Sequence, residues 1–204
     1  MNLEDAQTGL IAVAHEAHAR GWVPATSGNF SARLASGDIA ITVSGKDKGK
    51  LAPEDIVRMS AAGTAHGRLK PSAETLLHLQ LYDRDTRINA VVHTHSVNAT
   101  VASQSSSGRI CFENLEILKA FSGVATHAAS IVIPIFENKQ DIEVLANEVE
   151  RYMTNHGQGI AYLIAGHGLY TWGADINESM RHLEALEYLF DYARLSPSGA
   201  AENE

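Results

Sequence analysis

The sequence lacks the features of a disulfide-bonded, membrane-spanning or secreted protein. Cys111 is the one cysteine among 204 residues, so no internal disulfide can form, as is typical of the reducing cytoplasm. No apolar run approaches the roughly 20 residues that a membrane span needs. The first ten residues, MNLEDAQTGL, have neither a basic nor an apolar region, so we expect no signal peptide and a cytoplasmic location.

Basic residues are also scarce. Lys and Arg number 16 against 24 Asp and Glu, and the net charge of -8 argues against a nucleic-acid partner, whose phosphates need dense basic charge. The composition, 45% hydrophobic and 20% charged, is that of a globular protein with a core. We expect one domain over residues 1–195 and a frayed, small and polar tail over residues 196–204.

Apolar spacing predicts helices and strands mixed within this domain. Helical periodicity and capping residues predict helices at 3–20, from about 71 onward, around 142–153 and at 177–194. Alternating or continuous apolar runs predict strands at 39–43, 89–96 and 130–137, and two short strands within 161–173. Residues 26–33, TSGNFSAR, have the composition of a turn. The pattern indicates an α/β or α+β sandwich.

A candidate metal site begins with the sequence VVHTHS. Successive side chains of a strand point to opposite faces, so His93 and His95 share one face. A catalytic zinc usually has three protein ligands, and His167, between two glycines in AGHGLY, is the best third candidate. The alternative is that each motif is incidental in a chain with ten histidines.

Three short segments could hold an anion. Ser44 and Gly45 end a predicted strand, a turn contains Asn29, and Ser72 stands at a predicted helix start. Hydroxyls and backbone N–H groups of this kind bind phosphate. Each segment alone is better explained as a loop or a helix cap. Local positive charge comes from nearby basic residues: Lys46, Lys48, Lys50, Arg68 and Lys70.

Two glutamates are candidate acid/base groups. Glu74 follows Ser72 in the predicted first turn of a helix, where the helix dipole stabilises a carboxylate. Glu116 has apolar sequence neighbours, and such surroundings can raise a carboxyl pKa toward the range useful for proton transfer. Both are also compatible with a purely structural role, and the residues alone do not separate the two interpretations.

Taken in order, these motifs resemble the class II aldolase/adducin family over residues 3–194. The resemblance is carried by PATSGNFSAR, ITVSGKDKG, KPSAETLLH, VVHTHS, IAGHGLYTWG and RHLEALEYLF. The GWVPATSGN opening and the SGKDKG run are most similar to a dehydratase branch of that family. The resemblance implies a single-domain α/β fold with a central, mostly antiparallel sheet flanked by helices. It also implies a homotetramer with active sites near subunit interfaces.

The resemblance further implies a site for a phosphorylated ketose. One Zn²⁺ per subunit would be bound by His93, His95 and His167, and the substrate phosphate by Asn29, Ser44, Gly45 and Ser72. Glu74 matches an aldolase-branch glutamate beside the metal, whereas Glu116 matches the spacing of the dehydratase-branch acid/base, which we favour for the proton transfers. The implied reaction is loss of water from the ketose. The alternatives are a sugar-phosphate aldolase or epimerase and, since three histidines are retained, less readily a non-catalytic adducin-like interaction module.

Overall fold

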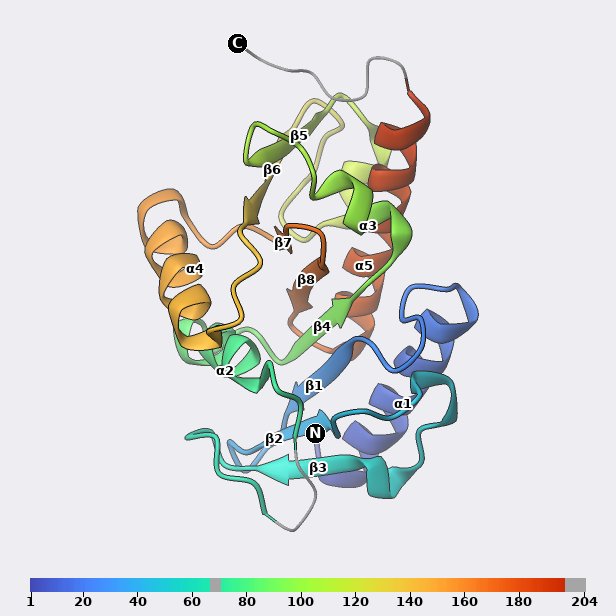
Figure 1. Ribbon diagram of the computed structural model, residues 1–204, viewed down its shortest axis with the longest axis vertical. Helices are drawn as coiled ribbons and strands as arrows, with labels where there is room; N and C mark the ends of the chain where they lie inside the picture. Colours follow the sequence, from blue (N-terminus) through green and yellow to red (C-terminus); the bar gives the residue numbers. More distant parts are fainter. Residues whose placement is uncertain (67–70, 197–204) are drawn as a thin grey trace. The chain divides into compact units, whose positions relative to one another are not determined.

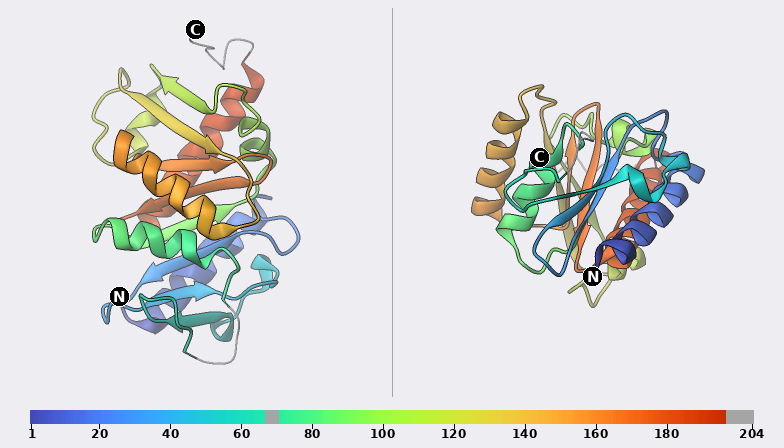
Figure 2. Two further views of the ribbon diagram at one scale, coloured as in Figure 1. Left: turned by 60° about the vertical axis from the view of Figure 1, so that its left-hand side comes forward. Right: turned by 90° about the horizontal axis from the view of Figure 1, so that it is seen from below.

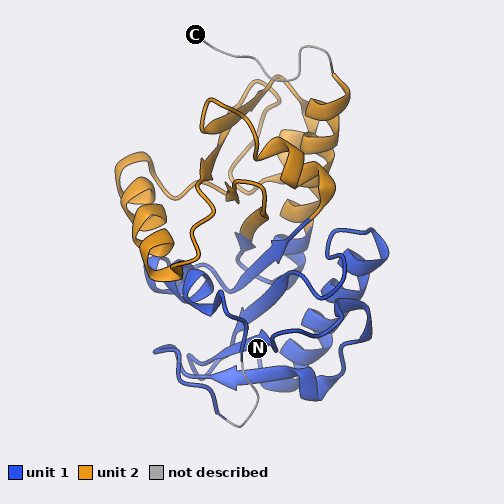
Figure 3. Cartoon of the chain, in the orientation of Figure 1, with its two compact units in different colours: residues 1–95, 172–180 blue, residues 96–171, 181–204 orange. Residues whose placement is uncertain are grey.

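The structure is a computed structural model that describes residues 1–66 and 71–196. It contains two compact units, shown in Figure 3. Unit 1 comprises Met1–His95 and Trp172–Met180, and unit 2 comprises Ser96–Thr171 and the chain from Arg181 onward. Within the described ranges, no helix is long and apolar enough to cross a membrane. Arg68, Lys70 and all but the first residue of the predicted tail lie outside the described residues.

Unit 1 is built on antiparallel strands in the order β3-β2-β1-β4 (Figure 1). The end of β8 lies beside β4, where the Asn89 N–H donates to the Gly173 carbonyl over 2.9 Å. The elements of this unit are α1 (Leu3–Ala19), β1 (Asn29–Arg33), β2 (Ile39–Thr42), β3 (Ile56–Met59), α2 (Thr75–Arg84) and β4 (Ala90–Thr94).

Helices α1 and α2 cover opposite faces of these strands, as the view from below in Figure 2 shows. Helix α1 begins at a capping box made by Asn2 and Asp5, and it buries Leu10, Val13 and Ala17. Strand β2, expected to be half-buried, is buried along its whole length because it lies between β1 and β3 and under α1. The core of unit 1 therefore lies on both faces of its strands.

Unit 2 contains strands in the order β8-β7-β6-β5, and the β6–β7 pair is parallel while the others are antiparallel. Helix α4 packs on β6 through a ring contact between Tyr152 and Phe136, with centroids 5.6 Å apart. Phe190 of α5 contacts Phe112 of β5. The elements are α3 (Val97–Ala102), β5 (Arg109–Glu113), β6 (Ser130–Phe136), α4 (Ile142–His156), β7 (Ala161–Ile164), β8 (Gly168–Gly173) and most of α5 (Ile176–Leu195).

The predicted α/β class, with mostly antiparallel strands flanked by helices, is confirmed. The turn predicted at residues 26–33 is wrong, because Asn29–Arg33 forms β1. The prediction failed there because two inward-facing residues of β1 are polar, so the segment does not show the apolar alternation of a strand. Helix α2 begins at Thr75 rather than at Ser72, and β3, α3 and β5 were not predicted.

Candidate metal and anion site

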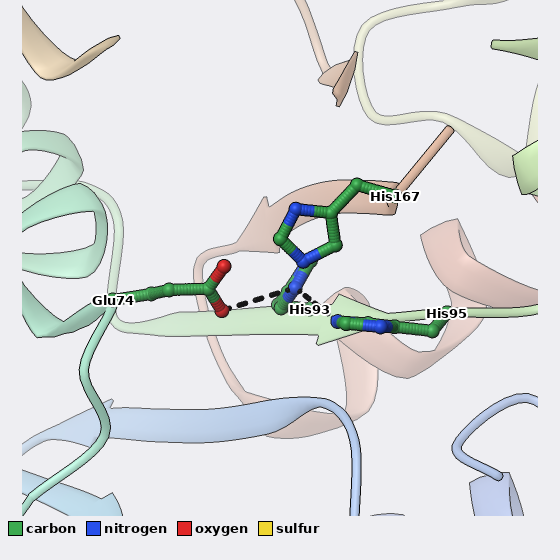
Figure 4. A group of neighbouring side chains, drawn as sticks. All are labelled: Glu74, His93, His95 and His167. Atoms are coloured by element: carbon green, nitrogen blue, oxygen red, sulfur yellow. Dashed lines mark hydrogen bonds and ion pairs between the residues drawn. The ribbon is translucent and has the colours of Figure 1, made fainter. Parts of the chain in front are cut away.

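Three potential metal ligands of unit 1 converge at the end of β4. The Nε2 atom of His93 lies 2.7 Å from Nε2 of His95 and 3.2 Å from Oε2 of Glu74 (Figure 4). Their potential ligand atoms all lie within 4.8 Å of one another. Bonds of about 2.0–2.1 Å to a tetrahedral zinc place its donor atoms about 3.3 Å apart. Nitrogen and carboxylate donors suit Zn²⁺ and several other divalent cations, so this group can hold a metal ion.

The position of the two histidines follows from the local backbone. His93 is fully buried near the end of β4, and His95 lies just beyond the strand, where its N–H donates to the Trp22 carbonyl over 2.8 Å. Gly28 has φ +74°, and a Cβ there would lie 2.8 Å from the His93 carbonyl oxygen. Only glycine allows the preceding loop to approach the strand this closely. The prediction that His93 and His95 project to one side is confirmed by their ring contact.

Glu74 is held by β1. Its Oε2 accepts a hydrogen bond of 2.9 Å from Nδ2 of Asn29, and Asn29 is directly opposite His93 in the β1–β4 pair. Glu74 is the N-cap residue of α2 and not, as expected, part of the first turn. It still lies at the positive end of the helix dipole, which stabilises a carboxylate.

His167, the third predicted histidine, belongs to unit 2. It lies in the tight turn between β7 and β8, where its N–H donates to the Ile164 carbonyl over 3.0 Å. Its Nδ1 is 3.3 Å from Oδ1 of Asn138. A partner of this kind orients a histidine so that Nε2 can bind a metal ion. The strand–turn–strand arrangement predicted around His167 is confirmed, and its role as a ligand stays a prediction.

Two of the predicted phosphate-binding segments meet in unit 1. Val43 and Pro71, the residues that precede Ser44 and Ser72, form an antiparallel bridge. Ser44 and Gly45 are exposed, and Ser72 is half-buried with its hydroxyl accepting from the Glu74 N–H over 3.3 Å. The amide of Asn29, in contrast, contacts Glu74 and His78. Phosphate binding by all four residues stays a prediction.

The described lysines among the basic residues expected to add local positive charge, Lys46, Lys48 and Lys50, contact groups of their own loop. Lys46 pairs with Asp55 at 3.0 Å and Lys50 with Asp47 at 3.4 Å. Lys48 is buried, and its Nζ donates to the carbonyls of Thr26, at 3.1 Å, and Lys46, at 2.8 Å. Burial lowers the pKa of Lys48 to about 8, only partly opposed by the charge of Asp47. These lysines stabilise the loop through contacts within the chain.

Of the two interpretations left open for Glu116, the structure agrees with an exposed polar side chain and not with apolar surroundings. Glu116 begins the short 3-10 helix Glu116–Ala120 in unit 2, and its side chain is 75% exposed. Its Oε1 pairs with Nζ of Lys119 at 2.7 Å, and the Lys119 hydrogen bond is the main reason why the pKa of Glu116 is lowered. Of its apolar sequence neighbours, only Leu118 is fully buried, since the 3-10 turn leaves Glu116 facing solvent.

His78 and Glu187 are buried titratable residues that the sequence did not single out. His78 in unit 1 is fully buried next to the candidate site, and burial lowers its pKa to about 3. Its spacing of four residues from Glu74 was the available signal. Glu187 in unit 2 is 3% exposed, and burial raises its pKa to about 7. Nothing in its helical sequence distinguishes it from a surface glutamate.

The sequence and the fold are similar to those of known dehydratases and of a sugar-phosphate aldolase. The class II aldolase and adducin N-terminal domain profile matches residues 8–193. The methylthioribulose-1-phosphate dehydratase of Methylococcus capsulatus is 56% identical over 84% of this chain and 84% of its own. The dehydratase of Pseudomonas syringae pv. syringae is 48% identical over 94% and 95%. L-fuculose-1-phosphate aldolase from Thermus thermophilus superposes with a TM-score of 0.72, at 26% identity over 92% and 93%.

Proposed function

The chain belongs to the class II aldolase and adducin N-terminal domain family, and we propose that it is a methylthioribulose-1-phosphate dehydratase of methionine salvage. The substrate would be 5-methylthioribulose 1-phosphate, and the product 2,3-diketo-5-methylthiopentyl 1-phosphate. The observation that carries the proposal is the convergence of Glu74, His93 and His95 in a chain 56% identical to a protein of that name. A lyase reaction of this type needs such a metal-binding group beside acid/base carboxylates.

The proposed metal is Zn²⁺, one per subunit, bound by His93, His95 and His167, with Glu74 beside it. The contact of His167 Nδ1 with Oδ1 of Asn138 supports His167 as the third histidine, because it leaves Nε2 for a metal ion. When bound, Zn²⁺ would polarise the substrate carbonyl and so acidify the neighbouring C3 proton.

The residues of the chain would carry the proton transfers and the positioning. Glu116 would remove the C3 proton and then donate a proton to the departing C4 hydroxyl, after which the enol becomes the diketone. Asn29, Ser44, Gly45 and Ser72 would hold the phosphate, so that the reacting bonds meet a carboxylate rather than solvent. The bridge between Val43 and Pro71 supports the shared role of the Ser44 turn and Ser72.

The assembly and location that we propose are those expected from the sequence. A homotetramer with active sites near its subunit interfaces would allow the exposed Glu116 to be covered by a neighbouring subunit. Sedimentation of the purified chain measures the subunit number. A cytoplasmic location agrees with a phosphorylated substrate of central metabolism.

The test is the identity of the product. The purified, zinc-loaded chain is incubated with 5-methylthioribulose 1-phosphate, and the products are separated by mass spectrometry. We expect a diketone phosphate that is lighter than the substrate by one water, and no three-carbon phosphate. His93→Ala protein, handled in the same way, is the matched control and should give no product.

Two other outcomes would overturn the proposal. Dihydroxyacetone phosphate among the products would mean that the C3–C4 bond is cleaved, as in an aldolase. The other outcome is that no product forms, the protein binds no metal, and the His93→Ala variant folds and behaves as the wild type. That outcome would favour a non-catalytic interaction module.

A further inference from the structure

A chain of side-chain hydrogen bonds runs from Glu74 into the core of unit 1. Asn29 Nδ2 donates to Glu74 over 2.9 Å, and Asn29 Oδ1 contacts Nε2 of His78. His78 Nδ1 lies 2.7 Å from the Ser31 hydroxyl, which lies 2.8 Å from the Tyr82 hydroxyl. Beyond Glu74, every member is at most 4% exposed. Buried polar groups that are hydrogen-bonded throughout rigidify their surroundings.

This series of hydrogen bonds forms because the spacing of polar residues on β1 matches that on α2. Asn29 and Ser31 are two residues apart on β1, so their side chains lie on one face of the strand. Glu74, His78 and Tyr82 are each four residues apart at the start of α2 and along it, so they lie on one face of the helix. The polar face of the strand meets the polar face of the helix, and β1 is paired with β4, the strand that carries His93.

The contacts fix the direction of every hydrogen bond. An ionised carboxylate only accepts, so Asn29 donates through Nδ2 and accepts through Oδ1. His78 must therefore carry its proton on Nε2. Burial lowers the pKa of His78 to about 3, so the ring is neutral and Nδ1 accepts from Ser31. The Ser31 oxygen is then left to accept from the Tyr82 hydroxyl.

We propose that Asn29 and His78 are positioning residues that hold the Glu74 carboxylate beside His93, and that His78 does so as the Nε2–H tautomer. The role deepens the proposed function, on which it rests for its catalytic consequence, whereas the tautomer does not depend on any reaction. It gives the Asn29 side chain a role toward Glu74 in addition to the proposed contact with the phosphate. Partners of this kind typically change metal affinity or activity about 10–100-fold when they are lost.

Nitrogen NMR of the metal-free protein tests the tautomer directly. In protein labelled with ¹⁵N-histidine, we expect one ring with a protonated Nε2 and an unprotonated Nδ1 that does not titrate between pH 5 and pH 8.5. This signal should be absent from His78→Gln protein and present in His18→Ala protein, since His18 is exposed. A proton on Nδ1 of His78, or titration near pH 6.5, would overturn the inference even if the product assay succeeds.

Substitutions test the positioning role. In His78→Leu, kcat should fall about 10–100-fold with little change in KM. When the protein is titrated with Co²⁺ and followed by absorption, the variant should bind the ion more weakly. His78→Gln, whose amide can still donate toward Asn29, should recover part of both losses. Tyr82→Phe removes only the last hydrogen bond of the series, at the end far from Glu74. It is the control and should have a much smaller effect.

The Co²⁺ titration keeps the two proposals distinguishable, because it needs no substrate. Weaker Co²⁺ binding in His78→Leu, with recovery in His78→Gln, supports the positioning role even if the product is not a diketone. Equal Co²⁺ binding and equal kcat in wild type and His78→Leu, with unchanged circular dichroism, would overturn it. If His78→Leu does not fold, the same comparison is made between Asn29→Asp, which sets a second carboxylate against Glu74, and wild type.

Discussion

Glu74 in unit 1 and Glu187 in unit 2 are both glutamates drawn away from solvent, but their surroundings differ. Glu74 accepts a hydrogen bond from Asn29 and lies next to His93. The carboxylate of Glu187 makes no well-formed hydrogen bond among the described residues, and only the nearby Ser96 hydroxyl favours its ionised form. Burial therefore raises the pKa of Glu187 to about 7, with the Ser96 hydroxyl opposing the shift and Asp191 adding to it. Donors stabilise a buried carboxylate as an ion, and burial alone favours its protonated form.

Glu116 completes the comparison as the exposed case. It combines high exposure with an ion pair to Lys119, and its pKa is lowered. The three glutamates thus differ in burial and in the groups that contact each carboxylate. The following predictions test the three environments and the site beside Glu74, from the largest expected effect to the smallest.

The largest effect should follow removal of the proposed acid/base. Glu116→Gln keeps the size of the side chain but removes proton transfer, so kcat for the methylthio-ketose phosphate should fall about 10²–10⁴-fold. Glu113→Gln, an exposed glutamate three residues earlier, is the matched control and should retain activity. Metal content, measured on both variants, should stay unchanged.

The opposite pattern would transfer the role to Glu74. Near-normal turnover in Glu116→Gln, together with an inactive Glu74→Gln that still holds its metal, would mean that the glutamate beside His93 does the chemistry. Glu116 would then be a surface residue whose ion pair has no part in catalysis.

Removal of a proposed ligand should empty the metal site. Loss of a residue that only orients a ligand typically weakens metal binding about 10–100-fold. His93→Ala should weaken it more, because one donor of the converging group is lost. Mass spectrometry of dialysed protein should find about one ion per chain in the wild type and very little in the variant. His156→Ala, an exposed histidine of α4, should retain the metal. Full metal content in His93→Ala would show that the ion binds elsewhere.

The buried Glu187 should make stability fall as pH rises. Its pKa is about 7 in the folded chain against an ordinary 4.5, so the folded state holds the proton more tightly. Between pH 4.5 and pH 7 the unfolded chain ionises first, and the free energy of unfolding decreases until both states are ionised. At about 1.4 kcal/mol for each pKa unit, the loss is about 3 kcal/mol.

Glu187→Gln removes this titration. In urea unfolding, the variant should be more stable than wild type at pH 8.5. Across the titration range, its free energy of unfolding should change by about 3 kcal/mol less than that of wild type. Glu143→Gln, an exposed residue of α4, is the control and should behave as wild type. A wild type whose stability is constant from pH 5 to pH 8.5 would contradict the buried, unpaired environment of Glu187.

The histidines were predictable because their signals are local. Alternation along a strand set His93 and His95 on one side, and flanking glycines marked the turn that carries His167. Strand β1 was missed because Asn29 and Ser31 point inward, and buried polar residues have the same sequence pattern as a turn. The hydrogen-bond chain that explains their burial needs α2 as its second half.

The burial of the glutamates was not predictable, because it depends on how each helix packs. Apolar neighbours in the sequence left open whether Glu116 is buried, because burial depends on which side of the 3-10 helix packs against the unit. Glu187 lies on the face of α5 that also buries Leu183 and Phe190. A helical pattern identifies the apolar stripe of α5 but gives no reason to include a glutamate in it.

The smallest effect should come from the ion pair of Glu116. In Lys119→Ala, the pKa of Glu116 should rise toward its ordinary value, because the Lys119 hydrogen bond and charge are the main causes that lower it. The acid limb of the pH profile of kcat/KM should then move to higher pH, since Glu116 must be ionised to accept the C3 proton. Stability should not change measurably, because exposed ion pairs contribute little. An unchanged acid limb, in an enzyme that Glu116→Gln inactivates, would mean that Lys119 does not contact Glu116 in the working assembly.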